Sequence, residues 1–398
     1  MFNIRFLSNG LIQLAAIVVA QFLCLSTWFA GSLLWIGLPA FKFLSPWLAG
    51  ILLNGVQLGF VLGTALSFYL GIANRYSSNK LFALSCLWVA MANALVWLTA
   101  DPVFICISRI AVGFGIAGVY PIGMKIIIDQ FGDRAYRFMG WIVFALTLGS
   151  GLPHLIISFT PRDNYSDWVI GVTSAAALAA GVIMWFLRPI QRSKSKIEEL
   201  ARDSVSGFAN VRITVLGYLG HMWELYAFWT FLPFLVRKYI KETDASMICF
   251  AVMLAGALGC ILPAVFRGKL TNKNYLLFCL MLSALCCFIQ PMIPVTVDKN
   301  LILLFLLIWG WVVIADSPLF SANLGRVVPH NQRGGIMTLS TSLGFALAMI
   351  SVQSLTHLNS TQGLWPYFGW FLLPGPLMAW WLVKRSSSLE TVDNVQGA

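Results

Sequence analysis

A few ionisable side chains stand inside long apolar stretches of the chain, where a charge is costly and marks a functional position. His221 and Glu224 are three residues apart, so a helix carries them on one face. A buried imidazole or carboxyl group can exchange a proton near neutral pH. We therefore expect this pair, and Glu224 above all, to be a proton site. The alternative is a structural hydrogen bond to a neighbouring helix.

Arg109 and Asp316 are the other charged residues expected at membrane depth. Arg109 should face the protein interior or a water-filled cavity, because hydrocarbon excludes it. There it either binds an anionic group or braces helices through backbone carbonyls, and both interpretations stay open. Asp316 precedes Ser317-Pro318; it fits a gating ion pair with Arg326 or Arg333, or a coupling site.

Four further side chains add polar and aromatic surface to the same pathway: Gln21, Trp28, Tyr226 and Trp229. A single aromatic residue is more often packing than ligand contact. The chain has no phosphate-binding loop, no His-Glu-x-x-His and no Gly-x-Ser-x-Gly, so we expect no enzyme, no catalytic residue, no metal and no cofactor.

The elements that must position these residues are apolar helices. Apolar residues make up 59% of the chain and charged residues 10%, and the mean hydropathy is +0.81. A bilayer core takes about 20 apolar residues per helix, and the chain offers about twelve such segments. They fall near 11–38, 47–70, 80–100, 102–125, 138–158, 167–187, 211–236, 245–266, 275–294, 301–322, 334–356 and 365–384. The sequence predicts an all-α membrane protein.

Short motifs recur between the two halves of the chain. The recurring pairs are Trp35-Ile-Gly-Leu-Pro39 with Trp229-Thr-Phe-Leu-Pro233, Tyr120-Pro121 with Ser317-Pro318, and Gly63 with Gly259. Paired halves of apolar helices are a common plan of secondary transporters. We predict an N-terminal six-helix bundle, a cytoplasmic linker, a C-terminal six-helix bundle and a cytoplasmic tail, with the bounds 1–190, 191–210, 211–384 and 385–398.

The formal charge of +11 follows from membrane topology. With a cytoplasmic N-terminus, most Lys and Arg residues fall on the cytoplasmic side, as the positive-inside rule requires. Basic loops facing anionic lipid explain the charge, so no nucleic-acid partner is expected. The first apolar segment is too long for a cleaved signal peptide. The eight cysteines lie in predicted spans and are expected to be free thiols.

Two motifs resemble the major facilitator superfamily. The loop Gly71-Ile-Ala-Asn74-Arg75-Tyr-Ser-Ser-Asn-Lys80 is similar to the family's cytoplasmic gate loop, with Asn74 in place of an Asp that forms part of a charged latch. Arg109-x-x-x-Gly113-x-Gly115 resembles the family's Arg-and-Gly helix. The resemblance implies twelve transmembrane helices in two six-helix bundles that rock about a central site. The small residues Gly55, Gly59 and Gly63 predict close helix packing.

From these residues we expect a monomeric secondary transporter in a plasma membrane, such as a bacterial inner membrane. Its partners would be a small-molecule substrate, protons and the lipid bilayer. The preferred substrate is a small organic or metabolite anion, attracted by Arg109, with the proton taken by Glu224. A proton antiporter that exports amphipathic or cationic compounds is the main alternative, and a non-transporting membrane receptor is another.

Overall fold

The computed structural model describes most of the chain. The described residues are 4–31, 33, 44–98, 101–131, 135, 138–161, 164–187, 206–240, 245–265, 272–328, 333–361 and 365–385. Within these ranges the chain forms helices and turns and no strand. The first copy of the repeated Trp-to-Pro motif, most of the predicted linker and the predicted tail lie outside the described residues.

The chain divides into two compact units. Unit 1 comprises Met1–Lys42 and Gly55–Lys196, and unit 2 comprises Phe43–Asn54 and Ile197–Ala398. Helix α3 therefore contributes its first residues to unit 2 and the rest to unit 1.

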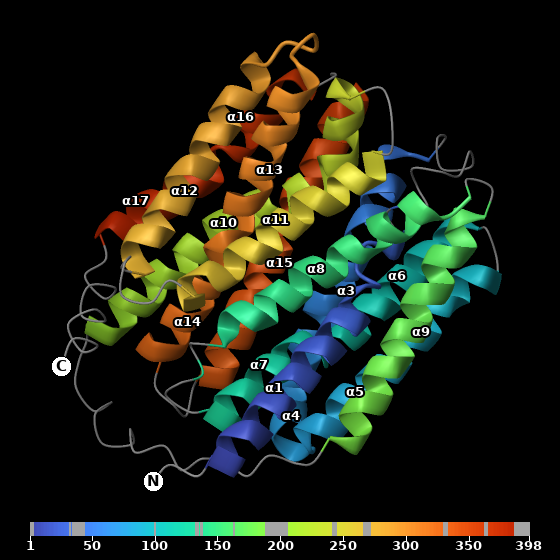
Figure 1. Cartoon of the computed structure of the whole chain (residues 1–398), viewed down its shortest axis with the longest axis vertical. Helices are drawn as coiled ribbons and strands as arrows, with labels where there is room; N and C mark the ends of the chain where they lie inside the picture. The colour runs from blue at the N-terminus through green and yellow to red at the C-terminus, as the bar shows by residue number, and fades with distance from the viewer. Residues whose placement is uncertain are drawn as a thin grey trace. The chain divides into compact units, whose positions relative to one another are not determined.

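The helices of unit 1 follow the predicted segments closely. They are α1 (Ile4–Leu25), α3 (Pro46–Leu70), α4 (Ile72–Arg75), α5 (Ser78–Ala94) with the 3₁₀ turn η2 (Leu95–Leu98), α6 (Pro102–Ile116), α7 (Tyr120–Phe131), α8 (Met139–Phe159) and α9 (Tyr165–Phe186). Helix α1 packs against α8 and α9, and α5 packs against α6 and α9. The bluish to green ribbons of Figure 1 trace this unit.

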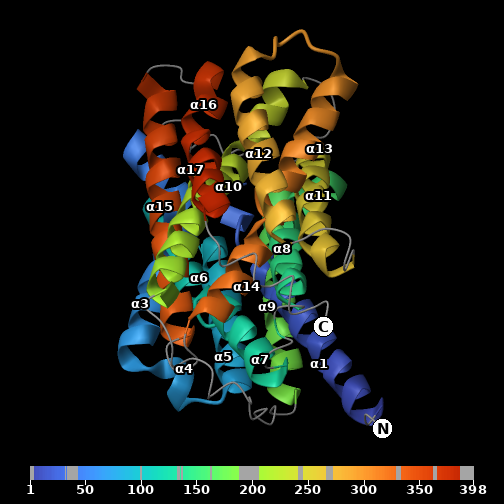
Figure 2. The ribbon, with the colours of Figure 1, turned by 90° about the vertical axis from the view of Figure 1, so that its left-hand side faces the viewer.

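The helices of unit 2 also follow the predicted segments. They are α10 (Ser206–Tyr239), α11 (Ala245–Val265), α12 (Asn272–Ile289) with η5 (Gln290–Met292), α13 (Lys299–Ala315), α14 (Ser317–Val327), α15 (Arg333–Thr361), η7 (Trp365–Tyr367), α16 (Phe368–Leu372) and α17 (Pro374–Arg385). The long α10 packs against α14, α15 and α17. Helix α13 lies beside α11 and α12, as Figures 1 and 2 show.

The fourth and tenth predicted segments are each broken into two helices. Helix α6 ends at Ile116 and α7 begins at Tyr120, while α13 ends at Ala315 and α14 begins at Ser317. Both breaks stand directly at the repeated Tyr120-Pro121 and Ser317-Pro318 motif. Proline has no backbone N–H to continue the hydrogen-bond ladder, so a helix tends to break where it occurs. Interrupted helices at matching positions of two halves are a typical feature of transporter sites.

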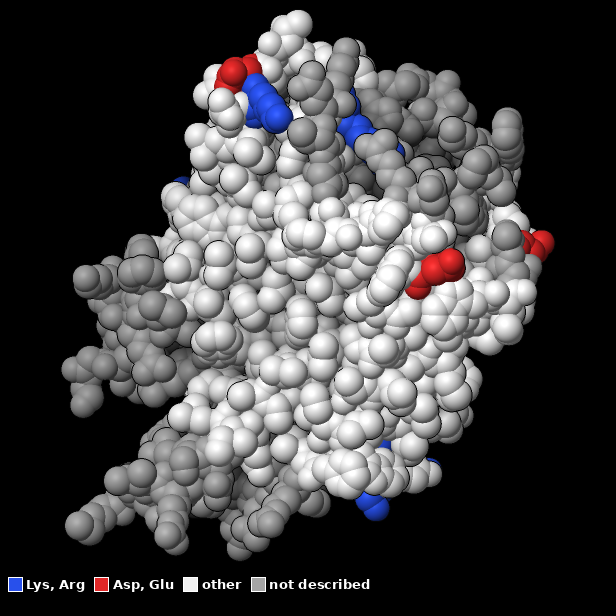
Figure 3. Space-filling view, turned by 45° about the vertical axis from the view of Figure 1, so that its right-hand side comes forward, with Lys and Arg blue, Asp and Glu red and all other residues white. Residues whose placement is uncertain are grey.

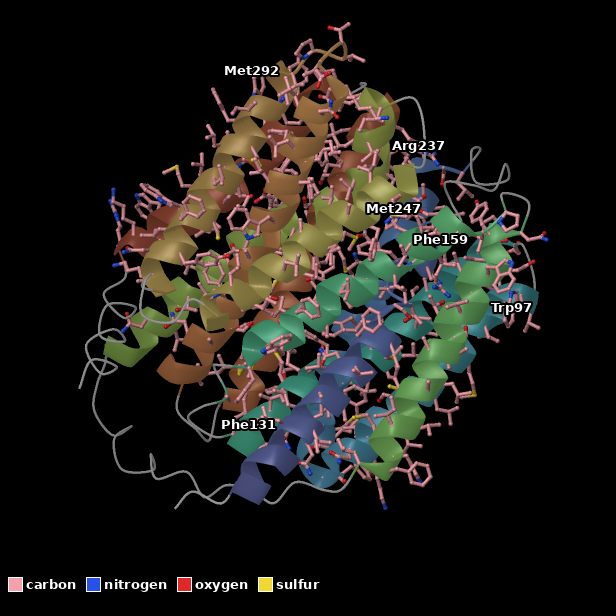
Figure 4. The ribbon with its side chains drawn as sticks, in the orientation of Figure 1. Trp97, Phe131, Phe159, Arg237, Met247 and Met292 are labelled. Atoms are coloured by element: carbon pink, nitrogen blue, oxygen red, sulfur yellow. The ribbon has the colours of Figure 1, made fainter. Side chains whose placement is uncertain are left out.

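The described surface suits a lipid environment. Nine helices in the described part of the chain are long and apolar enough to cross a membrane. Charged side chains are sparse over the described surface in Figure 3, most of which is white. Large apolar side chains are exposed, including Trp97 at the end of η2 and Phe159 at the end of α8, both labelled in Figure 4. All eight cysteines are free and buried, as the sequence predicts.

Candidate functional site

Close contact between α3 and α6 fixes the surroundings of Arg109. A methyl group at Gly59 would collide with the carbonyl oxygen of Ile110, and one at Gly63 would lie 2.7 Å from the carbonyl oxygen of Phe114. From the other side, Gly113 lies against the backbone of Val56. Glycine permits this backbone approach because it has no Cβ. The predicted close-packing role of the glycine ladder is confirmed.

Arg109 is enclosed by glycines and braced on one side. Its side chain packs against Gly31 and Gly55 and is 1% exposed. Its Nη2 atom donates to Ser108 Oγ at 3.1 Å and makes a longer contact of 3.5 Å with the backbone carbonyl of Asn93. Two of the three guanidinium nitrogens, Nε and Nη1, find no hydrogen-bond partner among the described residues. Among the described residues, one nitrogen thus braces helices and the other two have no hydrogen-bond partner.

Asn93 secures the carbonyl that Arg109 contacts. Its side-chain amide donates to Thr173 Oγ1 at 3.0 Å and to Ser174 Oγ at 2.8 Å, both on α9. Ser108 in turn donates to the carbonyl of Ala92 at 2.7 Å. The guanidinium therefore rests on a hydrogen-bonded junction of α5, α6 and α9 inside unit 1, which holds its position.

Glu224 receives three hydrogen bonds inside unit 2. Its Oε1 atom accepts from Ser283 Oγ at 2.6 Å, from Trp309 Nε1 at 2.8 Å and from Cys287 Sγ at 3.2 Å. The donors come from α12 and α13, and Glu224 itself is 2% exposed. Three donors aimed at one oxygen can accommodate the negative charge of a carboxylate without water. The same group can also hold a proton, so the site suits proton exchange.

His221 pairs with Asp316 in the same unit. The Nδ1 atom of His221 lies 2.8 Å from Asp316 Oδ1, and both side chains are almost fully buried. The imidazole is flanked by the rings of Tyr218 and Phe320, each with its centroid 6.0 Å away. Its Nε2 atom has no hydrogen-bond partner among the described residues. Asp316 thus joins α10 to the break between α13 and α14.

The structure gives His221 and Glu224 separate partners, although the sequence places them on one helical face. Residues three apart on a helix point about 60° away from each other, because 3.6 residues complete a turn. Two neighbouring side chains can therefore meet different helices. Asp316 approaches His221, whereas the expected alternatives Arg326 and Arg333 have side chains outside the described part of the chain.

The remaining predicted pathway residues are buried in their own units. Gln21 lies against Gly123 of α7, and neither polar atom of its amide has a hydrogen-bond partner among the described residues. The Trp28 ring is 6.1 Å from that of Phe60. In unit 2, Tyr226 contacts the rings of Trp229 and Phe345, at centroid distances of 5.5 Å and 4.8 Å. These aromatic residues form packed clusters.

The loop after α3 turns at a glycine whose backbone is left-handed. Gly71 adopts a φ of 63° in the left-handed region, which turns the chain into α4. Arg75 and Lys80 are exposed, and the side chain of Asn74 lies outside the described part. Lys125 of α7, which the sequence analysis does not single out, donates to Ser78 Oγ at 3.2 Å. It also pairs with Asp129 at 3.0 Å.

Sequence reasoning missed the polar partners of the two main charges. Ser283, Cys287 and Trp309 surround Glu224, and Asn93 supports Arg109. A scan for hydrogen-bonding side chains inside apolar segments would have found Asn93 and Ser283. Cys287 and Trp309 are ordinary residues of apolar helices and give no such signal.

Fold and site together define an integral, multi-pass membrane protein with two helical units, each of which buries charged side chains. The chain belongs to the Major Facilitator Superfamily, which matches residues 17–352. It is therefore a secondary transporter and not an enzyme. The match confirms the family suggested by the gate loop and the arginine motif.

Known transporters resemble the chain, two of them along most of its length and one over about a third of it. The inner membrane metabolite transport protein YgcS of Escherichia coli K12 is 24% identical, with 78% of this chain and 75% of that protein covered. The proline/betaine transporter of the same organism is 26% identical over 35% of this chain and 32% of its own. The crystal structure of a D-xylose-proton symporter matches 95% of this chain and 98% of its own, with a TM-score of 0.74 and 16% identity.

Proposed function

We propose that the protein is a proton-coupled transporter of a small organic or metabolite anion that works by alternating access. The observation that carries the proposal is Arg109, a buried cation with two nitrogens that lack hydrogen-bond partners in the described part of the chain. A buried polar group without a partner calls for an explanation, and a bound ligand is one. An anion that accepts from these nitrogens would supply the missing partners.

Glu224 is the proposed proton carrier. Its carboxyl group sits among three hydrogen-bond donors and is shielded from water. Removing or adding its proton changes the charge buried in unit 2, and a buried charge strongly affects the stability of one conformation relative to another. Protonation of Glu224 can therefore shift a conformational equilibrium and couple proton flow to substrate flow. The name of one structural neighbour, a proton symporter, is consistent with this role.

Ligand screening of the purified protein tests the proposal. A ligand present at about a hundred times its dissociation constant should stabilise the fold by about 2.7 kcal/mol. We expect stabilisation by anionic metabolites, and loss of it in Arg109→Ala. The control Arg212→Ala removes an exposed arginine of α10 and should keep the response. Stabilisation by amphipathic cations that persists in Arg109→Ala would instead support the export of cationic compounds.

Flux of the anion found in the screen then tests proton coupling. In proteoliposomes with an imposed pH gradient, wild-type protein should accumulate the anion. Glu224→Gln should bind it yet lose the pH-driven component. Asp167→Asn, which neutralises an exposed acid in the first turn of α9, is the matched control. Undiminished pH-driven flux in a folded Glu224→Gln variant would refute the proton role.

A further inference from the structure

Helix α17 ends in two pairs of an aromatic ring and a cation. Lys384 Nζ lies 4.7 Å from the centroid of the Trp380 ring, and Arg385 Cζ lies 3.9 Å from that of Trp381. The members of each pair are four residues apart, a spacing that brings side chains together on a helix. A ring face attracts a cation, and a cation held in this way still offers N–H groups to a second partner. Both basic side chains are exposed, and neither has an acidic partner among the described residues.

Helix α12 brings a third cation to the same end of unit 2. Helices α12 and α17 pack against each other (Figure 1). Gly369 of α16 lies against the backbone of Cys287, near the end of α12, whereas Val383 near the end of α17 shares a buried cluster with Tyr275 in the first turn of α12. The two helices are therefore antiparallel, and α12 begins where α17 ends. Lys273 lies in this first turn of α12 and is 8% exposed.

The described acids of unit 2 lie elsewhere. Glu224 and Asp316 are buried in the helical core. Asp298 begins α13, which follows the opposite end of α12. In the described part of unit 2, the end of α17 is therefore a positively charged surface without an exposed carboxylate.

Apolar side chains continue from these cations along both helices. The exposed ones are Leu377, Met378 and Trp381 on α17, and Phe278, Met281 and Leu285 on α12. Those on α12 recur at spacings of three and four residues, so they form one stripe along that helix. A ligand that fits both features has an anionic head and long apolar chains. A free phosphate ion would match the cations but not the apolar stripe.

We propose that the end of unit 2 at which α12 begins and α17 ends binds the headgroup of an anionic phospholipid. Lys384 and Arg385 bind the phosphate, and Lys273 adds positive charge from α12. The rings of Trp380 and Trp381 hold the two phosphate-binding cations in position, and the acyl chains lie along the exposed apolar side chains. The sequence analysis predicts that this end is cytoplasmic, where membranes carry anionic lipid. The inference depends neither on the transported substrate nor on proton coupling.

Lipid binding by the purified full-length protein tests the site. The probes are phosphatidylglycerol and phosphatidylcholine with identical acyl chains, added to the protein in a neutral detergent, and native mass spectrometry counts the bound lipids. We expect wild type to bind phosphatidylglycerol in preference to phosphatidylcholine. The double variant Lys384→Gln, Arg385→Gln should bind phosphatidylglycerol about thirtyfold more weakly, or by about 2 kcal/mol, since each basic residue near a membrane contributes about 1 kcal/mol.

Two sets of variants separate this site from general effects of charge. The double variant Arg237→Gln, Lys238→Gln is the matched control, because it also removes two cations from the last turn of a helix, α10. Lys238 likewise lies over a ring, 5.2 Å from the centroid of Tyr239, at the far end of α12 where Tyr239 meets Gln290. The control should keep the affinity for phosphatidylglycerol. Trp381→Leu should lower it about two- to fivefold through loss of the ring face, whereas Trp381→Phe should keep it.

Three results would overturn the proposal: equal affinity of wild type for the two lipids, unchanged affinity in the folded Lys384→Gln, Arg385→Gln variant, or an equal loss in the α10 control. Inorganic phosphate in large excess should not displace phosphatidylglycerol. Displacement would indicate a site for a free anion and would overturn the assignment to a lipid.

Discussion

The hydrogen bond from Trp309 to Glu224 allows the charge of the carboxyl group to be measured. A hydrogen bond to a charged group contributes about 1.5–3 kcal/mol to stability, and one between neutral groups about 0.5–1.5 kcal/mol. The indole donates to Oε1 at 2.8 Å, and the ring of Trp309 is fully buried. Trp309→Phe removes the donor and also some packing. The change in stability of this single variant therefore combines the lost hydrogen bond with the lost packing.

A double-mutant cycle separates the charge from the packing. Gln at position 224 keeps an accepting oxygen but stays neutral, so the cycle of Trp309→Phe with Glu224→Gln reports the excess strength of the charged hydrogen bond. We expect a coupling free energy of about 1 kcal/mol at a pH where Glu224 is ionised, and about zero where it is protonated. The coupling should thus rise with pH, because only the wild-type carboxyl group gains charge.

The assay is equilibrium unfolding of four proteins in the same detergent, at pH values from 5 to 9. For a chain of this size, about 1 kcal/mol corresponds to a shift of roughly 1–2 °C in thermal midpoint. Trp311→Phe is the control, since Trp311 lies on the same helix with its indole against Gly259. Its coupling to Glu224→Gln should be near zero at every pH. A Trp309 coupling that stays constant with pH would refute proton exchange at Glu224.

Two further predictions concern the glycines. Gly59→Ala should destabilise the protein by about 1–3 kcal/mol, because its new methyl group meets the Ile110 carbonyl and overpacking is costly. Gly10→Ala in α1 has room for a methyl group, because its nearest neighbours are 3.7 Å away. This variant should stabilise the protein by about 0.5–1 kcal/mol. Equal midpoints of thermal unfolding for Gly59→Ala and Gly10→Ala would contradict the packing argument. Gly71→Ala should destabilise the protein by about 1–2 kcal/mol, because the backbone at this position is left-handed. Asn tolerates that conformation, so Gly71→Asn should recover part of the loss in the same measurement.

The helices and the breaks of this fold could be predicted from the sequence, whereas the partners of the buried charges could not. Long apolar segments set the positions of the helices, and the repeated Tyr120-Pro121 and Ser317-Pro318 motifs stand at the interrupted ones. The same reasoning correctly selected Arg109 as a buried residue. It gave no indication that Asp316 would meet His221, because that contact depends on how α10 rotates against α13 and α14.

The internal repeat supports a functional origin for the buried charges. Aligning the Trp-to-Pro motifs sets Thr27 against His221 and Ala30 against Glu224, and aligning the proline motifs sets Leu306 against Arg109 and Val119 against Asp316. In each case the other half of the chain buries an uncharged residue at the equivalent position. A buried ion is difficult to stabilise, and an apolar replacement of similar size is often as stable or more so.

Arg109 thus lies in unit 1, and Glu224, Asp316 and His221 lie in unit 2, on two copies of one helical plan. If folding alone required these groups, both copies would need them, yet each copy folds with an uncharged residue where the other has a charge. This pattern supports the proposed mechanism, in which the copy with Arg109 attracts an anion and the copy with Glu224 handles protons. Replacing each charge by its uncharged counterpart, as in Arg109→Leu, Glu224→Ala or Asp316→Val, should accordingly impair transport more than folding.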